Sequence, residues 1–572
     1  MFIFDHNPVP TGAPDESGDG RAQMTRLQWT WGKKLSSEFL HCCAAILLQT
    51  LFSSTAFATC IAPPKMRTEL QGKPSAEKYA GLGTWFGIQK QFACAANAYA
   101  SAAKMQPDSE LYHFLWGLSL YTAGRAADAE EPLRAAARLN PSDVRPHLAL
   151  AAALDKMKRT TDAETEWRTA LAIDPDSETA LDALSQDLVD EKDYTAVVIL
   201  LGKPAETRVR SALQSLNLGI AYANTARLND ASEVLRGGLN TSPDSLPLAV
   251  ELALVLKLLS RDGEAYTVLE LALQHHPADF DTELLYCRML VSGHSDKARE
   301  MAHMLLLAHP NNSDVLFLNS VLESQEGDFK QARGHLERAV ASNPNDFKSQ
   351  RSLGEVLSKL QDLQGAKDHL EKAIALGDSS PEVQYELAKV LQSLGDRQQA
   401  QDRLRIYQQV KKAQSDRVQA AGNAEVGDQA IAAGDAVKAI QLYRAALATD
   451  PDEPILSYKL ALALDKTNDL VNEKAALEHA IKLNPKLAEA QNQLGYLAAR
   501  SGDTASAETY FRAAIDASPS YVAAWINLSA TLASETRWQD ATLAVNRALQ
   551  IDPSNTEARQ LAQAIQTAQT KQ

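Results

Sequence analysis

Few residues in this chain of 572 are spaced for chemistry. Gly81-Leu82-Gly83 with Gly87 is similar to a phosphate-binding loop, but the spacing differs from that fingerprint. These glycines also lie within a helical pattern, whereas a phosphate loop follows a strand. We find no serine–histidine–aspartate set and no nucleophile elbow. The sequence therefore predicts no enzyme and no bound cofactor.

One pair of histidines could contribute to a metal site. His275 and His276 precede Pro277, and Asp279 and Asp281 follow it. The side chains of adjacent histidines point apart, and no second cluster of ligands completes the set that a metal ion needs. The sequence therefore predicts no metal centre.

The first 58 residues differ from the rest of the chain. Residues 1–23 are polar without a helical period, whereas Met24 precedes several basic residues and then a mostly apolar stretch over 39–52. Ala56-Phe57-Ala58 matches the pattern at which secretory signals are cleaved. The apolar stretch is about 14 residues, shorter than the roughly 20 that a spanning helix needs. We expect cleavage after Ala58; the alternatives are an uncleaved membrane anchor and lipidation of Cys60.

Cleavage after Ala58 would leave Cys60, Cys94 and Cys287 in the mature chain. An oxidising compartment would permit a disulfide between Cys60 and Cys94. Two unpaired thiols are the alternative, because sequence alone does not decide pairing.

The charge balance excludes one class of partner. The chain has 72 acidic and 57 basic residues and a net charge of -15. Binding to phosphate needs clustered lysine and arginine, so neither nucleic acid nor an anionic membrane is expected as the main partner.

The organisation of the chain is visible in its prolines. Pro107, Pro141 and Pro175 are 34 residues apart, and the same step recurs in a second set, Pro451, Pro485, Pro519 and Pro553. A fixed period of this length indicates a repeated supersecondary unit. Each such unit packs only on its neighbours.

Within a unit, apolar and small residues recur at spacings of 3, 4 and 7, which place them on one face of a helix. The second unit has Trp116-Gly117, Leu120, Ala129, Leu133, Ala136 and Pro141. Two helices per unit follow, joined by polar turns such as 122–125 and 500–503. The small residue after the large one should let the second helix approach closely. An aspartate or serine beside the proline, as in Pro141-Ser142-Asp143 and Pro243-Asp244-Ser245, is expected to cap the helix that follows.

This pattern resembles the tetratricopeptide repeat family, whose signature is matched in most units over roughly 76–554. The resemblance implies an all-α fold, a right-handed superhelical solenoid of about 14 antiparallel helix pairs with a concave groove. By this register Cys287 falls at the small, close-packed position, where we expect a buried structural thiol.

Irregularities in the register divide the chain. The unit over 178–211 is degenerate, and Lys203-Pro204 should end its second helix early. The unit before Pro310 is one residue short, in the turn 292–294. The interval from Pro344 to Pro451 exceeds three repeats by five residues. We therefore expect an N-terminal extension and signal over 1–58, a short linker over 59–75, about 10 repeats over 76–408, a helical connector over 409–422, about 4 repeats over 423–554, and a capping helix and tail over 555–572.

In the family, the first helix of each pair lines the groove. Carried over by register, the groove residues are Phe114, Leu118, Tyr121, Asn217, Asn224, Tyr385, Lys389, Asn492, Tyr496, Arg500 and Asn527. Asparagines can hold an extended peptide backbone, and aromatic residues can supply apolar anchors. The alternative is that these side chains pack between neighbouring units. If the asparagines bind a partner, replacing Asn217 and Asn224 by alanine should weaken its capture without changing thermal stability.

We interpret the chain as a non-enzymatic scaffold or assembly factor that binds a protein or peptide in its groove. The predicted signal beside such an array suggests export to the periplasm or cell envelope of a Gram-negative bacterium. One alternative is a docking component of an envelope polysaccharide export machine. The other is a subunit of a glycan-modifying enzyme, which is disfavoured because no stretch outside the repeats could form a catalytic domain.

Overall fold

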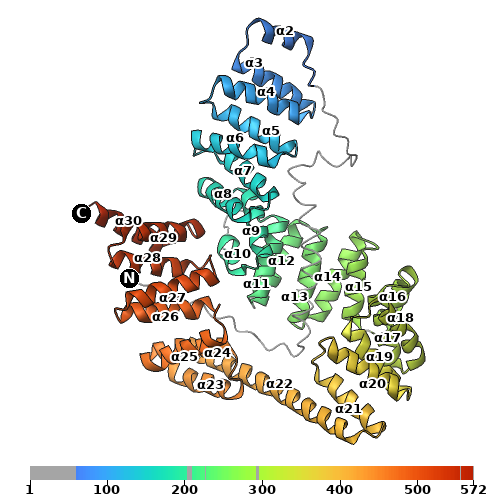
Figure 1. Ribbon diagram of the computed structural model, residues 1–572. Helices are drawn as coiled ribbons and strands as arrows, with labels where there is room; N and C mark the ends of the chain where they lie inside the picture. Colours follow the sequence, from blue (N-terminus) through green and yellow to red (C-terminus); the bar gives the residue numbers. More distant parts are fainter. Residues whose placement is uncertain (1–59, 203–208, 226, 292–294, 554, 571–572) are drawn as a thin grey trace. The chain divides into compact units, whose positions relative to one another are not determined.

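Helices make up all the regular structure in the described part of the chain. A computed structural model describes residues 60–202, 209–225, 227–291, 295–553 and 555–570. Within these ranges it contains 29 helices and no strand. Figure 1 shows the helices following one another along the chain. The predicted all-α repeat solenoid is therefore confirmed. The predicted signal over 1–58, Lys203-Pro204 and the turn 292–294 lie outside the described residues.

The chain forms two compact units, and their boundary falls inside α12. Among the described residues, the first unit comprises those from 60 to 234 together with those from 486 to 570. Its helices are α2 (Pro64–Gly72), α3 (Ala76–Ile88), α4 (Phe92–Met105), α5 (Glu110–Thr122), α6 (Ala126–Leu139), α7 (Val144–Lys156), α8 (Thr160–Ile173), α9 (Glu178–Asp190), α10 (Tyr194–Leu201), α11 (Ala212–Asn224), the start of α12 (Leu228–Thr241), α26 (Ala488–Arg500), α27 (Thr504–Ala517), α28 (Val522–Ser534), α29 (Trp538–Ile551) and α30 (Thr556–Gln569).

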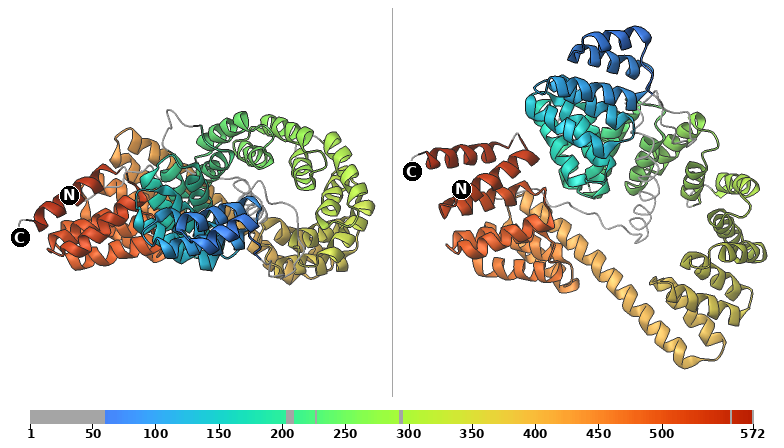
Figure 2. Two further views of the ribbon diagram at one scale, coloured as in Figure 1. Left: turned by 90° about the horizontal axis from the view of Figure 1, so that it is seen from above. Right: turned by 45° about the horizontal axis from the view of Figure 1, so that its top comes forward.

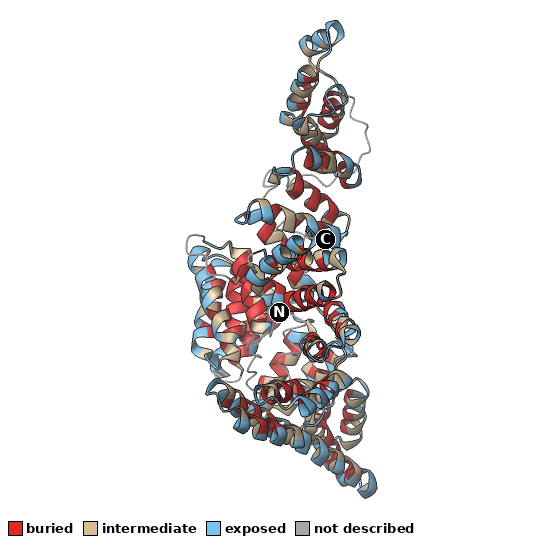
Figure 3. Ribbon diagram, turned by 90° about the vertical axis from the view of Figure 1, so that its left-hand side faces the viewer, coloured by how far each residue is buried: buried red, intermediate tan, exposed pale blue. Residues whose placement is uncertain are grey.

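The second unit is built from the residues between these two segments. Its helices are α13 (Leu246–Leu258), α14 (Asp262–His275), α15 (Phe280–Leu290), α16 (Ser295–Ala308), α17 (Ser313–Glu326), α18 (Phe329–Ser342), α19 (Phe347–Lys359), α20 (Leu363–Ala375), α21 (Pro381–Ser393), α22 (Arg397–Ala432), α23 (Ala436–Thr449), α24 (Pro454–Lys466) and α25 (Leu470–Leu483). In both units the first helix of a repeat packs on its second helix, which packs on the next repeat. Buried residues accordingly lie on the faces where helices meet, as Figure 3 shows.

The two helices of a repeat approach closely because one of them has almost no side chain at the contact. A Cβ atom on Gly117 would lie 2.5 Å from Cγ of Leu133, and one on Gly495 would lie 2.6 Å from the ring of Phe511. Leu133 and Phe511 are both 0% exposed. The predicted role of the small residue is confirmed, since a larger side chain would push the second helix away.

The two helix starts considered in the sequence differ. The Asp143 carboxylate accepts a hydrogen bond from the backbone N–H of Arg145 at 3.0 Å, as expected of an N-cap. Ser245 is the N-cap residue of α13, but its side chain makes no capping hydrogen bond. The turn glycines Gly124 and Gly502 have φ of 78° and 82°, which favours glycine because it lacks a Cβ.

The segment predicted as a linker over 59–75 contains the helix α2. Met66 and Leu70 of α2 pack against the hydrophobic cluster of the first repeat, which includes Leu82 and Phe86. The sequence argument missed α2 because it lies outside the repeat register. It acts as an extra packing layer on the first repeat, which would otherwise leave apolar surface exposed.

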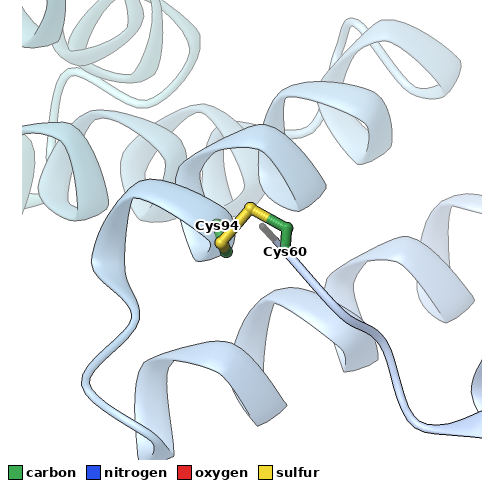
Figure 4. Close-up of a disulfide and its surroundings, with 2 residues drawn as sticks. All are labelled: Cys60 and Cys94. Atoms are coloured by element: carbon green, nitrogen blue, oxygen red, sulfur yellow. A yellow bond between two sulfur atoms is a disulfide. The ribbon is translucent and has the colours of Figure 1, made fainter. Parts of the chain in front are cut away.

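A disulfide joins the start of the described chain to the first repeat. Figure 4 shows the bond between the sulfur atoms of Cys60 and Cys94. Their Cα atoms are 5.5 Å apart. The pairing that the sequence left open is therefore present in the structure.

Two irregularities predicted from the register are visible. The helix α10 has 8 residues, whereas α8 has 14, so the second helix of that repeat does end early. The helix α22 has 36 residues and contains the whole predicted connector 409–422 (Figure 2). It serves both as the second helix of one repeat and as the first helix of the next. The predicted cap forms α30, in which Ala558 and Ile565 are buried.

Candidate functional site

Three of the four predicted groove asparagines are buried between neighbouring repeats. Asn217 is 1% exposed, and its amide donates a hydrogen bond to Ser185 Oγ at 3.0 Å. The amide of Asn527 donates to Asn492 Oδ1 at 3.1 Å, and that of Asn492 donates to the hydroxyl of Tyr521 at 3.4 Å. These side chains hold adjacent repeats together, so they do not offer an open surface for a peptide. These three asparagines therefore fit the alternative interpretation, in which the predicted groove side chains pack between neighbouring units.

Asn224 differs from the other three asparagines. It is exposed, and its amide donates to the carbonyl oxygen of Ile220 in its own helix at 2.8 Å. It is therefore the predicted groove asparagine whose surface a partner could reach.

The predicted groove aromatics carry cations against their rings. Lys389 Nζ lies 5.5 Å from the ring centroid of Tyr385, and the Arg500 guanidinium lies 5.5 Å from that of Tyr496. Tyr385 is 42% exposed. In both pairs the cation follows the tyrosine by four residues, the spacing that puts side chains on one helix face. Such contacts fix the cation's position and are worth about 0.5–1 kcal/mol at exposed sites.

The other predicted groove residues lie in the second repeat and are less accessible. Phe114 is 8% exposed, and the Arg145 guanidinium of the next repeat lies 5.3 Å from its ring centroid. Leu118 and Tyr121 are half-buried on the same helix, α5. Of the predicted set, Tyr385, Arg500 and Asn224 are therefore exposed, whereas Lys389 and Tyr496 are half-buried, like Leu118 and Tyr121.

Three partly buried polar pairs that the sequence argument missed join the helices within a repeat. His147 bonds Glu166 at 2.7 Å, and Gln350 bonds His369 at 2.7 Å. In a third repeat, Arg403 donates to Gln384 at 3.3 Å. The two partners are 19 residues apart in each case. Polar residues at this fixed separation in the repeat are visible in the sequence, and they could have predicted these pairs.

A group of carboxylates lies on α7, α8 and α9. Burial, together with repulsion from Asp155 and Glu164, raises the pKa of Asp187 to about 8. Burial also raises the pKa of Asp155 and of Asp190. Glu164 forms an ion pair with Arg168 on the same helix. Asp187 therefore retains a proton near neutral pH.

The two histidines considered for a metal site both contact Asp244, in the turn before α13. His275 Nδ1 lies 2.7 Å from a carboxylate oxygen of Asp244, and His276 Nε2 lies 2.7 Å from its backbone oxygen. In the part of the chain that the structure describes, no group of three or more histidine, cysteine or acidic residues could hold a metal ion. Gly83, from the suggested phosphate loop, lies inside α3 and makes room for the ring of Tyr99.

Cys287 is a structural thiol, as its place in the register predicts. It is 0% exposed, and its Sγ donates to the backbone oxygen of Ala298 at 3.4 Å. Burial raises its pKa to about 12, so little reactive thiolate forms at neutral pH.

A family model described as tetratricopeptide repeat matches six stretches of the chain, residues 89–144, 114–178, 318–381, 426–488, 472–521 and 492–556. No curated protein is similar enough to be matched.

Several solved structures are similar to parts of the chain. The Cut9–Hcn1 hetero-tetramer of the APC/C is 14% identical, with 88% of this chain and 99% of that chain covered and a TM-score of 0.26. PilF of Pseudomonas aeruginosa is 23% identical, with 36% and 94% covered and a TM-score of 0.30. MamA of Desulfovibrio magneticus RS-1 is 17% identical, with 30% and 96% covered and a TM-score of 0.27. Similarity at these low identities and TM-scores carries no information about the partners of this chain.

Substitution of a buried and of an exposed asparagine should have different effects on the free energy of unfolding. Asn217→Ala should lower the free energy of unfolding by about 1–2 kcal/mol, because it leaves the Ser185 hydroxyl without its buried donor. Asn224→Ala should change it by less than about 0.5 kcal/mol, because the side chain is exposed. Urea unfolding of each single variant measures both effects. Equal losses would show that the buried amide bond does not stabilise the repeat contact.

Stability should fall as the pH rises through the neutral range. The folded pKa of Asp187, about 8, lies above its unfolded value, so the folded state holds a proton that the unfolded state releases. This stabilisation is fully present below pH 4 and is lost as the pH rises to about 8. Its slope is at most about 1.4 kcal/mol per pH unit.

Urea unfolding between pH 5 and pH 8 tests this dependence. Asp187→Asn should flatten the pH profile, whereas Asp108→Asn, at an exposed position of the same unit, should leave it unchanged. A profile for Asp187→Asn that matches the unsubstituted protein would contradict the assignment.

Proposed function

Because the chain is a tetratricopeptide repeat protein, we propose that it is a non-enzymatic scaffold that binds a partner protein through the first helices of its repeats. We also propose that it is exported to the periplasm or cell envelope. Repeat arrays of this kind generally serve as protein-interaction scaffolds.

The observation that carries the binding proposal is the pair of tyrosine–cation contacts at the predicted groove positions. Tyr385 with Lys389, and Tyr496 with Arg500, lie on α21 and α26, the first helices of their repeats. Tyrosine buries a large apolar area while losing little rotamer entropy, so tyrosine and arginine are enriched at binding hot spots. A cation already held against the ring needs little further ordering when it bonds a partner.

These contacts support a protein partner better than a carbohydrate. Sugars stack on open ring faces, whereas a cation lies against each of these two rings. The polysaccharide-export and glycan-modifying alternatives therefore gain no support from the predicted groove. The buried asparagines also remove the ladder that the sequence suggested for peptide binding, so recognition would rest on the tyrosine–cation pairs.

The disulfide supports the proposed export. Cys60–Cys94 would persist in an oxidising compartment such as the periplasm, and it would be rare in a reducing cytosol. Cleavage after Ala58 would keep Cys60 in the mature chain as its second residue. Among the described helices, none combines the length and apolarity that spanning a bilayer requires.

Partner capture should depend on the tyrosine–cation pairs. The full chain is cross-linked in its native envelope, and the partner identified there is then titrated against purified variants. Tyr496→Ala with Arg500→Ala should weaken binding by about tenfold or more, because hot-spot truncations cost at least 1–2 kcal/mol. Leu543→Ala removes a side chain that is 69% exposed on the second helix α29, and it should leave affinity unchanged.

Two results would contradict the scaffold proposal. One is equal affinity of the double variant and the Leu543→Ala control, which would mean that binding does not use the first helices. The other is that the captured material is polysaccharide with no protein component.

The export proposal predicts that the native mature protein begins at Thr59. N-terminal sequencing of protein isolated from its source measures this directly. A native chain that retains residues 1–58 would overturn cleavage and leave the anchor as the explanation for the apolar stretch.

A further inference from the structure

The middle of α22 lies between two hydrophobic clusters and belongs to neither. At its N-terminal end, Ala400 belongs to a hydrophobic cluster formed by α18–α22. At its C-terminal end, Ala420, Ala424 and Ala430 belong to a second cluster with α23 and α24. Between them, none of the residues 401–419 is buried, and in 411–419 every residue except the half-buried Asp416 is exposed. At 1.5 Å per residue this bare segment is roughly 28 Å long.

The bare segment, residues 401–419, has the opposite charge to the chain as a whole. It contains five basic residues, Arg403, Arg405, Lys411, Lys412 and Arg417, and two acidic ones, Asp402 and Asp416, for a net charge of +3. The whole chain has a net charge of -15. The positive charge is therefore concentrated on this helix against an acidic background.

The same segment exposes apolar and aromatic side chains. The rings of Tyr407 and Tyr385 lie with their centroids 5.2 Å apart. Lys411 Nζ lies 5.5 Å from the ring centroid of Tyr407 and donates to its hydroxyl at 3.1 Å. Val418 is 45% exposed, two residues before Ala420 of the second cluster. A helix that served only as a solvated bridge would need polar residues all round, and these side chains depart from that pattern.

We propose that the bare segment of α22, with Tyr385 of α21, binds an acidic amphipathic segment of a partner protein. This inference rests on the proposed scaffold function and names the partner chemistry of one surface. The partner's carboxylates would meet Lys411, Lys412 and Arg417, while its apolar side chains would cover Tyr385, Tyr407 and Val418. Complementary charge speeds association and excludes partners of the wrong sign.

Charge also decides against other occupants. A second copy of the bare segment would place its +3 charge against another +3 charge, which is repulsive. Nucleic acid would contact five basic residues, but the chain as a whole has a net charge of -15. Long-range repulsion between the chain and the phosphates would weaken binding. An anionic lipid surface would face the same long-range repulsion.

The experiment titrates the full chain with a fluorescent synthetic peptide of glutamate–leucine heptads. The same peptide with lysine in place of glutamate and vesicles of phosphatidylglycerol serve as competing probes. We expect the acidic peptide to bind, with an affinity that falls as salt rises. Lys411→Glu with Lys412→Glu should reduce that affinity about tenfold or more, since like charges then face each other.

A matched control makes the same change of net charge at positions outside the bare segment. Lys438→Glu with Lys474→Glu places the same reversal on exposed positions of α23 and α25 in the same unit, and it should change affinity less than about twofold. Circular dichroism and urea unfolding check that both variants keep their helices. Lys411→Gln with Lys412→Gln, which adds no negative charge to the helix, should show a smaller loss in the same direction.

Several outcomes would overturn the inference. These are no binding of the acidic peptide, equal binding of the basic peptide, equal losses in both reversal variants, or binding to the vesicles instead. If partner capture still depends on Tyr496 and Arg500 while the acidic peptide fails to bind, only this inference fails and the scaffold function stands.

Discussion

Every repeat depends on how closely its two helices approach. At Gly117 and Gly495 there is no room for even one more carbon beside Leu133 and Phe511. Cys287 occupies the same small position in its own repeat and is completely buried. The distance between the helices fixes where each second helix lies, and the next repeat packs on that helix. A small error here would pass to each following repeat, because an array of this kind is held together only by neighbour contacts.

Polar contacts add selectivity to this apolar packing. The partly buried pairs at a separation of 19 residues, such as His147 with Glu166, join the helices of a single repeat. The buried asparagines, such as Asn527 with Asn492, join one repeat to the next. A buried polar group without a partner is costly, so these contacts disfavour any other register. Such side chains therefore belong to the architecture, and the surface left for partners consists of what they do not use.

That remaining surface is uneven along the chain. On α21 and α26, an exposed tyrosine and a half-buried one each have a cation against the ring. On α7, α8 and α9, burial and repulsion between carboxylates raise the pKa of Asp187, so that it holds a proton. In the bare segment of α22, no residue is buried, and a basic helix is exposed over most of 411–419. The five-residue excess in the register gives this helix its length, so an irregularity in the repeat and a candidate binding surface coincide.

The sequence alone determined the repeat period, the helix pairs, the small residues at the close contacts, the early end of α10 and the long helix before the last repeats. Most of these follow from patterns within about 34 residues, the span over which one repeat folds and packs. The long helix follows from the interval between Pro344 and Pro451, which exceeds three repeats by five residues. Only the tertiary structure decided that Asn217, Asn492 and Asn527 are buried while Tyr385 is exposed, and that α2 covers the first repeat. A position on the first helix fixes the direction of a side chain. Its exposure depends on how near the residues of the adjoining repeat lie, and that distance is set by packing between repeats.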